Sequence, residues 1–227
     1  TEKELCYKVN AEAPANLAKI ASEIKATFIT YSTDFVFNGL IEGYLYNEST
    51  GYTEEDEPHP LSTYAKAKYE GELLVSQIIE NPENTSRIYI IRTSWIFGKG
   101  SMNFVEKIIE LSKEKDELKV VDEQISSPTY SKDLAYFSWE LVKKGCESGV
   151  YHLTNDGVVS KYDEAQYILE KISWKGNLIR AKREELGLLA ERPKFSKLSC
   201  KKVKEKLGLS IPNWKDAIDR YLKENKY

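Results

Sequence analysis

The chain has 227 residues, a length that favours one compact domain, with or without a small addition, and excludes a large multidomain assembly. Its 33 Lys and Arg residues against 36 Asp and Glu residues leave a net charge of −3, and 41% of the residues are hydrophobic, which is typical of a globular protein with a core and excludes a disordered or collagen-like chain. Because so small a net charge creates no overall field, we expect neither nucleic acid nor a membrane as a partner.

Targeting and membrane-spanning patterns are not evident in the sequence. No stretch approaches about 18 consecutive apolar residues, and the first residues, TEKELCYKVN, lack the charged-then-apolar order of a secretion signal. A cytoplasmic location is therefore expected. Cys6, Cys146 and Cys200 are odd in number and far apart, so we predict no disulfide framework. Neither histidine has a Cys or a carboxylate at ligand spacing, and we expect no metal site.

Apolar periodicity predicts a helical N-terminal region followed by a strand. Residues 1–25 have apolar side chains at helical spacing, with a break expected at Pro14, and residues 27–37 have the apolar character of a buried strand. Residues 38–62 are rich in Gly, Asn, Pro and acidic side chains and are longer than an ordinary connection, so we predict a functional or protruding loop. A helix should then run over residues 63–79.

The rest of the chain alternates between strands and helices. We predict, in chain order, a strand at 88–97, a helix from Asn103, a strand at 118–121, a helix at 131–144, a strand at 150–154 and a helix after a cap at Ser160. Such alternation is typical of an α/β fold with right-handed crossovers. The pattern loosens after Trp174, where two short helices are expected in a Lys-rich, mainly helical tail, at 199–207 and 213–224.

The most informative spacing is that of Tyr64 and Lys68, four residues apart near the start of the predicted helix. This spacing places the two side chains on one helical face, one turn apart. A nearby ammonium favours the phenolate and lowers the pKa of the phenol from its usual value of about 10. The pair could therefore exchange a proton with a carbonyl group during its reduction. The same spacing is also common in ordinary surface pairs, and spacing alone does not separate the two interpretations.

Polar residues follow two of the predicted strands. Ser32, Thr33 and Asp34 stand at the end of the first, and the segment 92–95 ends the strand at 88–97. Ligands of open α/β sheets bind at the carboxyl ends of the strands, so we expect these groups to meet at one rim. The simpler alternative is that the strand ends are polar only because they meet water.

Several stretches, in their order along the chain, carry a family resemblance. In these stretches the sequence resembles the extended short-chain dehydrogenase/reductases and, within them, the dTDP-4-dehydrorhamnose reductase family. The stretches are STDFVFNG (32–39), YTEEDEPHPLSTYAKAKYEGE (52–72), RTSWIFG (92–98), DEQISSPTYSKDLA (122–135), GVYHLTNDGVVSKYDEAQYIL (149–169) and RPKFSKLSCKKVKEKLG (192–208).

The resemblance implies a Rossmann-like, doubly wound parallel sheet. Residues 1–150 would form the remainder of the NAD(P)-binding domain, and residues 151–227 a smaller, mainly helical substrate-binding region with one strand that joins the main sheet. The family's Gly-rich turn, which holds the cofactor pyrophosphate, precedes the part of the family pattern at which this sequence starts, so we expect that turn to be missing from the chain. The sequence therefore does not decide between NADPH and NADH.

The implied activity is NAD(P)H-dependent reduction of the 4-keto group of a dTDP-4-keto-6-deoxyhexose, a nucleotide-sugar, and the resemblance allows a homodimer. Tyr64 would protonate the sugar oxygen, Lys68 would hold the nicotinamide ribose, and Thr33 would hydrogen-bond the keto oxygen. Asp34 and Trp95 match positions that contact the nucleotide-sugar in the family. Arg192 and four lysines of the tail, Lys201, Lys202, Lys204 and Lys206, would lie near the diphosphate, and a solvated helix face is an equally plausible interpretation of these four lysines.

Four positions depart from the family pattern. Phe35 replaces a Tyr, Ala65 a Gly, Ser126 a Gly and Lys161 a Trp. If position 126 requires a positive φ, its serine would be strained by about 1 kcal/mol.

Two other functions remain open at this point. One is a non-catalytic regulatory subunit that resembles the β subunit of methionine adenosyltransferase, because a shared fold does not fix function. The other is a reductase or epimerase of a different nucleotide-sugar, which would use the same Tyr and Lys chemistry.

Overall fold

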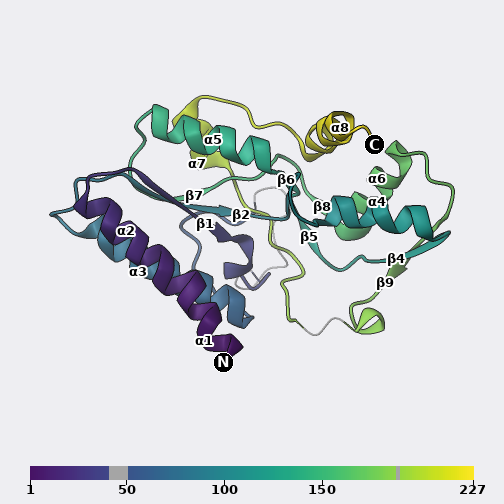
Figure 1. The fold of residues 1–227 in the computed structure, drawn as a ribbon, viewed down its shortest axis with the longest axis horizontal. Coiled ribbons are helices and arrows are strands. Elements are labelled where there is room, and N and C mark those ends of the chain that lie inside the picture. Colours follow the sequence, from purple (N-terminus) through teal and green to yellow (C-terminus); the bar gives the residue numbers. More distant parts are fainter. Residues whose placement is uncertain (41–50, 188–189) are drawn as a thin grey trace.

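A computed structural model describes residues 1–40, 51–187 and 190–227 of the chain (Figure 1). Its centre is a parallel sheet in the order β1-β2-β7, formed by β1 (Phe28–Thr33), β2 (Ile88–Thr93) and β7 (Gly149–His152). The predicted α/β class with parallel strands is confirmed.

Helices cover both faces of this sheet (Figure 1). On one face α2 (Ala13–Glu23) and α3 (Thr63–Glu80) pack on the apolar side chains of β1 and β2. On the other face lie α5 (Ser131–Lys143) and α7 (Lys201–Leu207). Strands covered on both faces read as continuous apolar runs, as β2 does with all six of its residues buried.

The N-terminal region is helical from its start. A helix α1 (Glu2–Tyr7) continues through a π-helical turn (Lys8–Glu12) into α2. The predicted break at Pro14 is wrong. Pro14 lies in the first turn of α2, directly after the π-helical turn, and the helical backbone continues past it.

A second layer of structure lies beside the main sheet. It contains the parallel pair β4 (Glu117–Val121) and β9 (Asn177–Ala181), covered by α4 (Phe104–Glu114), α6 (Lys161–Lys171) and α8 (Trp214–Asn225). Short strands connect the layers, with β3 (Ile96–Phe97) beside β6 (Thr129–Tyr130) and β5 (Ile125–Ser126) beside β8 (Val159–Ser160). A 3-10 turn (Glu184–Leu186) follows β9.

Two predicted strands end earlier than expected. After Thr33 the chain enters a 3-10 turn, Asp34–Val36, because the Thr33 Oγ1 accepts the backbone N–H of Phe35 at 3.2 Å. The predicted strand at 88–97 is interrupted between β2 and β3, where Trp95 has a φ of 42°. Apolar content predicted one strand there, but a left-handed residue cannot continue a strand.

The two layers draw on both halves of the sequence. The helix α4 and strand β4, before residue 150, belong to the second layer, and α7, after it, packs on the main sheet. The division at residue 150 stays a prediction. Within the described ranges, no helix has both the length and the apolarity that crossing a bilayer requires.

A buried ion pair connects α3 to the main sheet. The guanidinium of Arg92 on β2 donates from Nε to Glu72 Oε1 at 3.1 Å and from its terminal nitrogen to Oε2 at 2.7 Å. His152 on β7 lies 3.3 Å from the same guanidinium, and burial, followed by the charge of Arg92, lowers the pKa of its imidazole well below the usual value. The neutral ring can thus accept from Arg92 and donate from Nδ1 to the Tyr52 carbonyl at 3.0 Å.

Removal of one partner of this pair should be strongly destabilising. Glu72→Gln leaves the Arg92 charge buried without its counter-ion, and we expect the free energy of unfolding to fall by about 3 kcal/mol. Lys201→Ala, which removes the exposed pair of Lys201 with Glu205, is the control and should cost less than about 1 kcal/mol. Urea denaturation measures both, and equal costs would contradict the structural role of the buried pair.

Candidate active site

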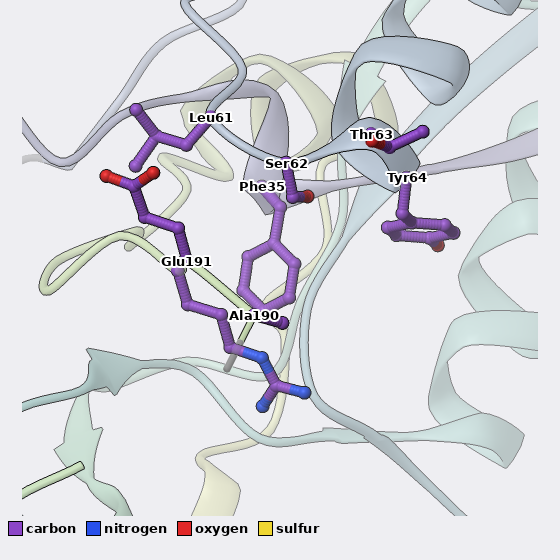
Figure 2. A pocket seen from close by; sticks show the side chains of 8 residues that line it. Phe35, Leu61, Ser62, Thr63, Tyr64, Ala190 and Glu191 are labelled. Carbon is purple, nitrogen blue, oxygen red and sulfur yellow. The ribbon is translucent and has the colours of Figure 1, made fainter. Parts of the chain in front are cut away.

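A pocket of about 610 Å³ lies where the carboxyl end of β1 meets the start of α3 (Figure 2). Its wall combines Phe35, just after β1, with the segment 61–64 at the beginning of α3. Residues 190–192 also line the pocket, and the Arg192 guanidinium lies 5.7 Å from the centroid of the Phe35 ring. The pocket therefore lies at the edge of the sheet where ligands of α/β folds bind.

Tyr64 lies in the pocket wall, and the first turn of α3 holds it there. Ser62 caps the helix, its Oγ accepting the N–H of Ala65 at 3.2 Å, and so fixes where the first turn begins. The Tyr64 side chain remains 44% exposed. Figure 2 shows its ring projecting from the helix start beside Ser62 and Phe35. Its hydroxyl is therefore accessible to a molecule in the pocket.

Lys68 lies one helical turn after Tyr64 and connects α3 to β1. Its Nζ donates to the carbonyl oxygen of Tyr31 at 2.5 Å. Burial lowers the pKa of this ammonium, and the charge of Glu72 partly opposes that change. The predicted pair of Tyr64 and Lys68 thus lies beside the end of β1. The Tyr31 carbonyl that Lys68 contacts is two residues before Thr33.

The predicted lowering of the Tyr64 pKa is wrong for the protein alone. Burial raises the pKa of the phenol above its usual value, and the negative charge of Asp34 adds to the increase. The ammonium of Lys68 does not offset these effects in this arrangement. At neutral pH Tyr64 is consequently protonated, the state that a proton donor needs.

Asp34 is buried, 2% exposed, and its carboxylate is occupied by hydroxyl groups of the protein. Its Oδ2 accepts from Ser196 Oγ at 2.5 Å and from Ser126 Oγ at 3.1 Å, and its Oδ1 accepts from Thr33 Oγ1 at 3.2 Å. Burial raises the pKa of this carboxyl to about 6, against the lowering effect of these hydrogen bonds. The predicted contact of Asp34 with substrate stays a prediction. In the structure, Asp34 orients the Thr33 hydroxyl through their hydrogen bond.

Ser126 is not strained. It lies in β5, and the positive φ angles outside glycine occur elsewhere among the described residues, Trp95 included. The condition for the expected strain, a positive φ at this position, is therefore not met. Instead the hydroxyl contributes the hydrogen bond to Asp34. The other donor, Ser196, was not singled out in the sequence, because no local pattern connects it to a carboxylate 162 positions earlier.

Trp95 follows β2 and is partly buried against the core of the second layer. It is not among the residues that line the pocket beside Tyr64. The structure therefore brings Tyr64, Lys68, Thr33 and Asp34 together at the end of β1 and places Trp95 at the end of the neighbouring strand.

The ends of β1 and β2 fit a nicotinamide cofactor. Ser32 Oγ and Thr93 Oγ1 are buried there and have no hydrogen-bond partner among the residues that the structure describes, although such groups are nearly always paired. Together with Lys68, these hydroxyls supply donors and acceptors at the rim where the predicted cofactor would lie. No group of three His, Cys, Asp or Glu side chains suited to a metal occurs within the described residues, and the predicted lack of a metal stays a prediction.

Comparison with known proteins places this geometry in a class. A solved dTDP-4-dehydrorhamnose reductase from Bacillus anthracis, in complex with NADP, has a TM-score of 0.88 at 33% identity and covers 98% of this chain and 74% of its own. A UDP-galactose 4-epimerase, at 18% identity and a TM-score of 0.77, shares the fold. The fold is thus that of the Rossmann-like reductases and epimerases.

Relatives in sequence narrow the assignment. The curated dTDP-4-dehydrorhamnose reductase of Escherichia coli K12 is 31% identical over 235 residues, covering 99% of this chain and 74% of the relative. The spore coat polysaccharide biosynthesis protein SpsK of Bacillus subtilis is 36% identical over 225 residues, with 98% and 74% covered. The RmlD substrate binding domain matches residues 1–227, and the chain belongs to this dTDP-4-dehydrorhamnose reductase family.

The raised pKa of Asp34 predicts a pH dependence of stability. Because the folded protein binds the Asp34 proton more tightly than the unfolded chain, the contribution of Asp34 to stability is greatest below pH 3.8 and is lost as pH rises towards about 6. Asp34→Asn removes this titration, so between those pH values the wild-type protein should lose about 3 kcal/mol relative to the variant.

Denaturation at a series of pH values measures this difference. The same chemical change at the exposed Asp116, Asp116→Asn, serves as the surface control. If the difference in the free energy of unfolding between the wild-type protein and Asp34→Asn stays constant from pH 4 to about pH 6, the raised pKa of Asp34 is contradicted.

Proposed function

We propose that the protein reduces the 4-keto group of dTDP-4-dehydrorhamnose to give dTDP-rhamnose, with NADPH or NADH as the cofactor. The observation that carries the proposal is the position of Tyr64: a protonated phenol in the wall of the pocket, one turn from Lys68 and beside the strand end that carries Thr33. Membership of a reductase family and the NADP complex of the Bacillus anthracis relative support it.

The chemistry divides between the cofactor and the protein. When bound, the reduced nicotinamide supplies a hydride to the carbonyl carbon. The protein supplies the proton: Tyr64 donates from its hydroxyl to the keto oxygen as negative charge develops there. The raised pKa of Tyr64 keeps that proton in place until the hydride is transferred.

Lys68 and Thr33 orient the reacting groups. The Lys68 ammonium, held at the Tyr31 carbonyl, has further donor capacity for the hydroxyls of a ribose. The Thr33 hydroxyl donates to Asp34 and turns towards the substrate when it hydrogen-bonds the keto oxygen. Asp34, anchored by Ser126 and Ser196, holds the Thr33 hydroxyl before the substrate binds and releases it when that hydroxyl donates its single proton to the keto oxygen.

The part of the pocket wall formed by Arg192 suits the remainder of the substrate. Arg192 presents a guanidinium, which binds phosphate oxygens through paired hydrogen bonds. The proposal places the diphosphate of the nucleotide-sugar near Arg192 and gives Trp95 a contact with the same ligand. It also includes a cytoplasmic location and a homodimer. No observation favours the regulatory subunit.

Replacement of the proton donor should remove most of the activity. Tyr64→Phe keeps the ring in the wall but lacks the hydroxyl, so we expect turnover to fall by about 10² or more. Loss of NADPH absorbance in the presence of the dTDP-4-keto sugar measures the rate in the full-length protein.

Tyr136→Phe is the matched control, because Tyr136 is an exposed tyrosine on α5, on the opposite face of the sheet. This variant should retain the wild-type rate. Retained turnover in Tyr64→Phe would rule out Tyr64 as the proton donor, and NADPH oxidation without the keto sugar would contradict the substrate.

A further inference from the structure

A buried lysine lies at the start of α6, outside the pocket. Lys161 is the first residue of that helix, and its side chain is 12% exposed. Its Nζ lies 2.7 Å from Oε2 of Glu164, which is itself 1% exposed. Enclosing a charged lysine is expensive unless the ammonium finds compensating partners. An enclosed lysine of this kind does not serve simply as a solvent-exposed charge on the helix surface, and its contacts indicate its role.

The ammonium contacts two aromatic rings. Its Nζ lies 3.5 Å from the ring centroid of Trp95 and 4.0 Å from that of Phe104, the first residue of α4. Both distances are well inside the range of about 6 Å for cation–π attraction, which is strongest for Trp and increases when the cation is desolvated. Lys161 thus connects α6 and α4 to the turn that follows β2.

Trp95 is in a conformation that needs such support. Its φ of 42° is a left-handed angle that a bulky side chain rarely adopts. Backbone strain of this kind persists only where the surroundings fix it. The Trp95 carbonyl accepts the N–H of Thr129 at 3.2 Å, and Ser94 Oγ donates to the Ser127 carbonyl at 2.6 Å. These bonds fix the backbone, and the indole ring packs against both Lys161 and the core of the second layer.

The charges around Lys161 indicate how it acts. Glu164 on the same helix pairs with the ammonium, and the charges of Asp34, at the end of β1, and Arg192, in the pocket wall, also reach it. Because Glu164 already neutralises the ammonium, Lys161 is not free to serve as a main ligand for a phosphate. An effect of Lys161 on a bound ligand would therefore act through the Trp95 ring.

We propose that Lys161 is a positioning residue for substrate binding: its ammonium holds the indole of Trp95 in the orientation in which that ring contacts the nucleotide-sugar. This inference rests on the proposed function, since it takes the nucleotide-sugar as the ligand of Trp95.

The first test compares KM with kcat. Lys161→Met keeps the length of the side chain but removes the charge, and we expect KM for the dTDP-4-keto sugar to rise about five- to thirtyfold, with kcat changed less than about twofold. Lys161→Arg retains a cation and should stay near wild type. Lys215→Met removes another lysine that lies near a tryptophan, 5.5 Å from the Trp214 ring centroid on α8, and should leave KM unchanged.

A double-mutant cycle with Trp95→Phe tests the route of the effect. If Lys161 acts through the indole, Lys161→Met should raise KM much less in the Trp95→Phe background than alone. Equal effects of Lys161→Met in both backgrounds would overturn the proposal, as would an unchanged KM in the single variant.

The second test needs no turnover. Burial lowers the pKa of Lys161, so the ammonium should lose its proton at a lower pH than an ordinary lysine. The emission of Trp95, taken as the difference between the wild-type protein and Trp95→Phe, should then show a step as pH rises from neutral. Lys161→Arg should abolish that step, because a guanidinium stays charged.

The two tests separate the two claims. A step that persists in Lys161→Arg would overturn the contact between Lys161 and Trp95. Absence of turnover and of dTDP binding in the full-length wild-type protein, with the step present, would overturn the proposed function and the substrate role of Lys161, while the contact itself would stand.

Discussion

The position of α3 against the main sheet depends on two polar contacts. Lys68 donates to the Tyr31 carbonyl of β1, and Glu72, one turn further on, pairs with Arg92 of β2. Apolar packing along the rest of α3 is not directional. These two contacts, in contrast, fix the rotation of the helix about its own axis and its position along the sheet. Because Tyr64 lies on the same helical face, one turn before Lys68, the same contacts set where the phenol meets the pocket.

Burial, more than neighbouring cations, governs the acid–base groups of the site. It raises the pKa of Tyr64 and that of Asp34 and lowers that of Lys68. The result is a phenol that is protonated at neutral pH and a carboxyl whose hydrogen bonds come from Thr33, Ser126 and Ser196. The proposed proton donor thus lies at the helix start, and the hydroxyl proposed to bind the keto oxygen lies at the end of β1.

Sequence patterns predicted the long elements and the strand-end residues, and they failed where geometry depends on distant partners. The helix predicted at 63–79 is observed at Thr63–Glu80, because a long period of apolar side chains and the Ser62 cap are both local signals. The strand β9 was missed, since its few apolar residues become a strand only by pairing with β4. Neither the left-handed turn at Trp95 nor the role of Ser196 at Asp34 has a local signature.

The chain passes between the main sheet and the second layer more than once. It leaves β2 for α4 and β4, returns through α5 to β7, continues to α6 and β9, and comes back to α7 before ending in α8. A single junction therefore cannot exchange the substrate-binding part for that of a relative. Replacement of whole segments would remove β7 or α7 from the main sheet on which α3 packs, so this framework favours changes of sugar specificity by substitution of individual side chains.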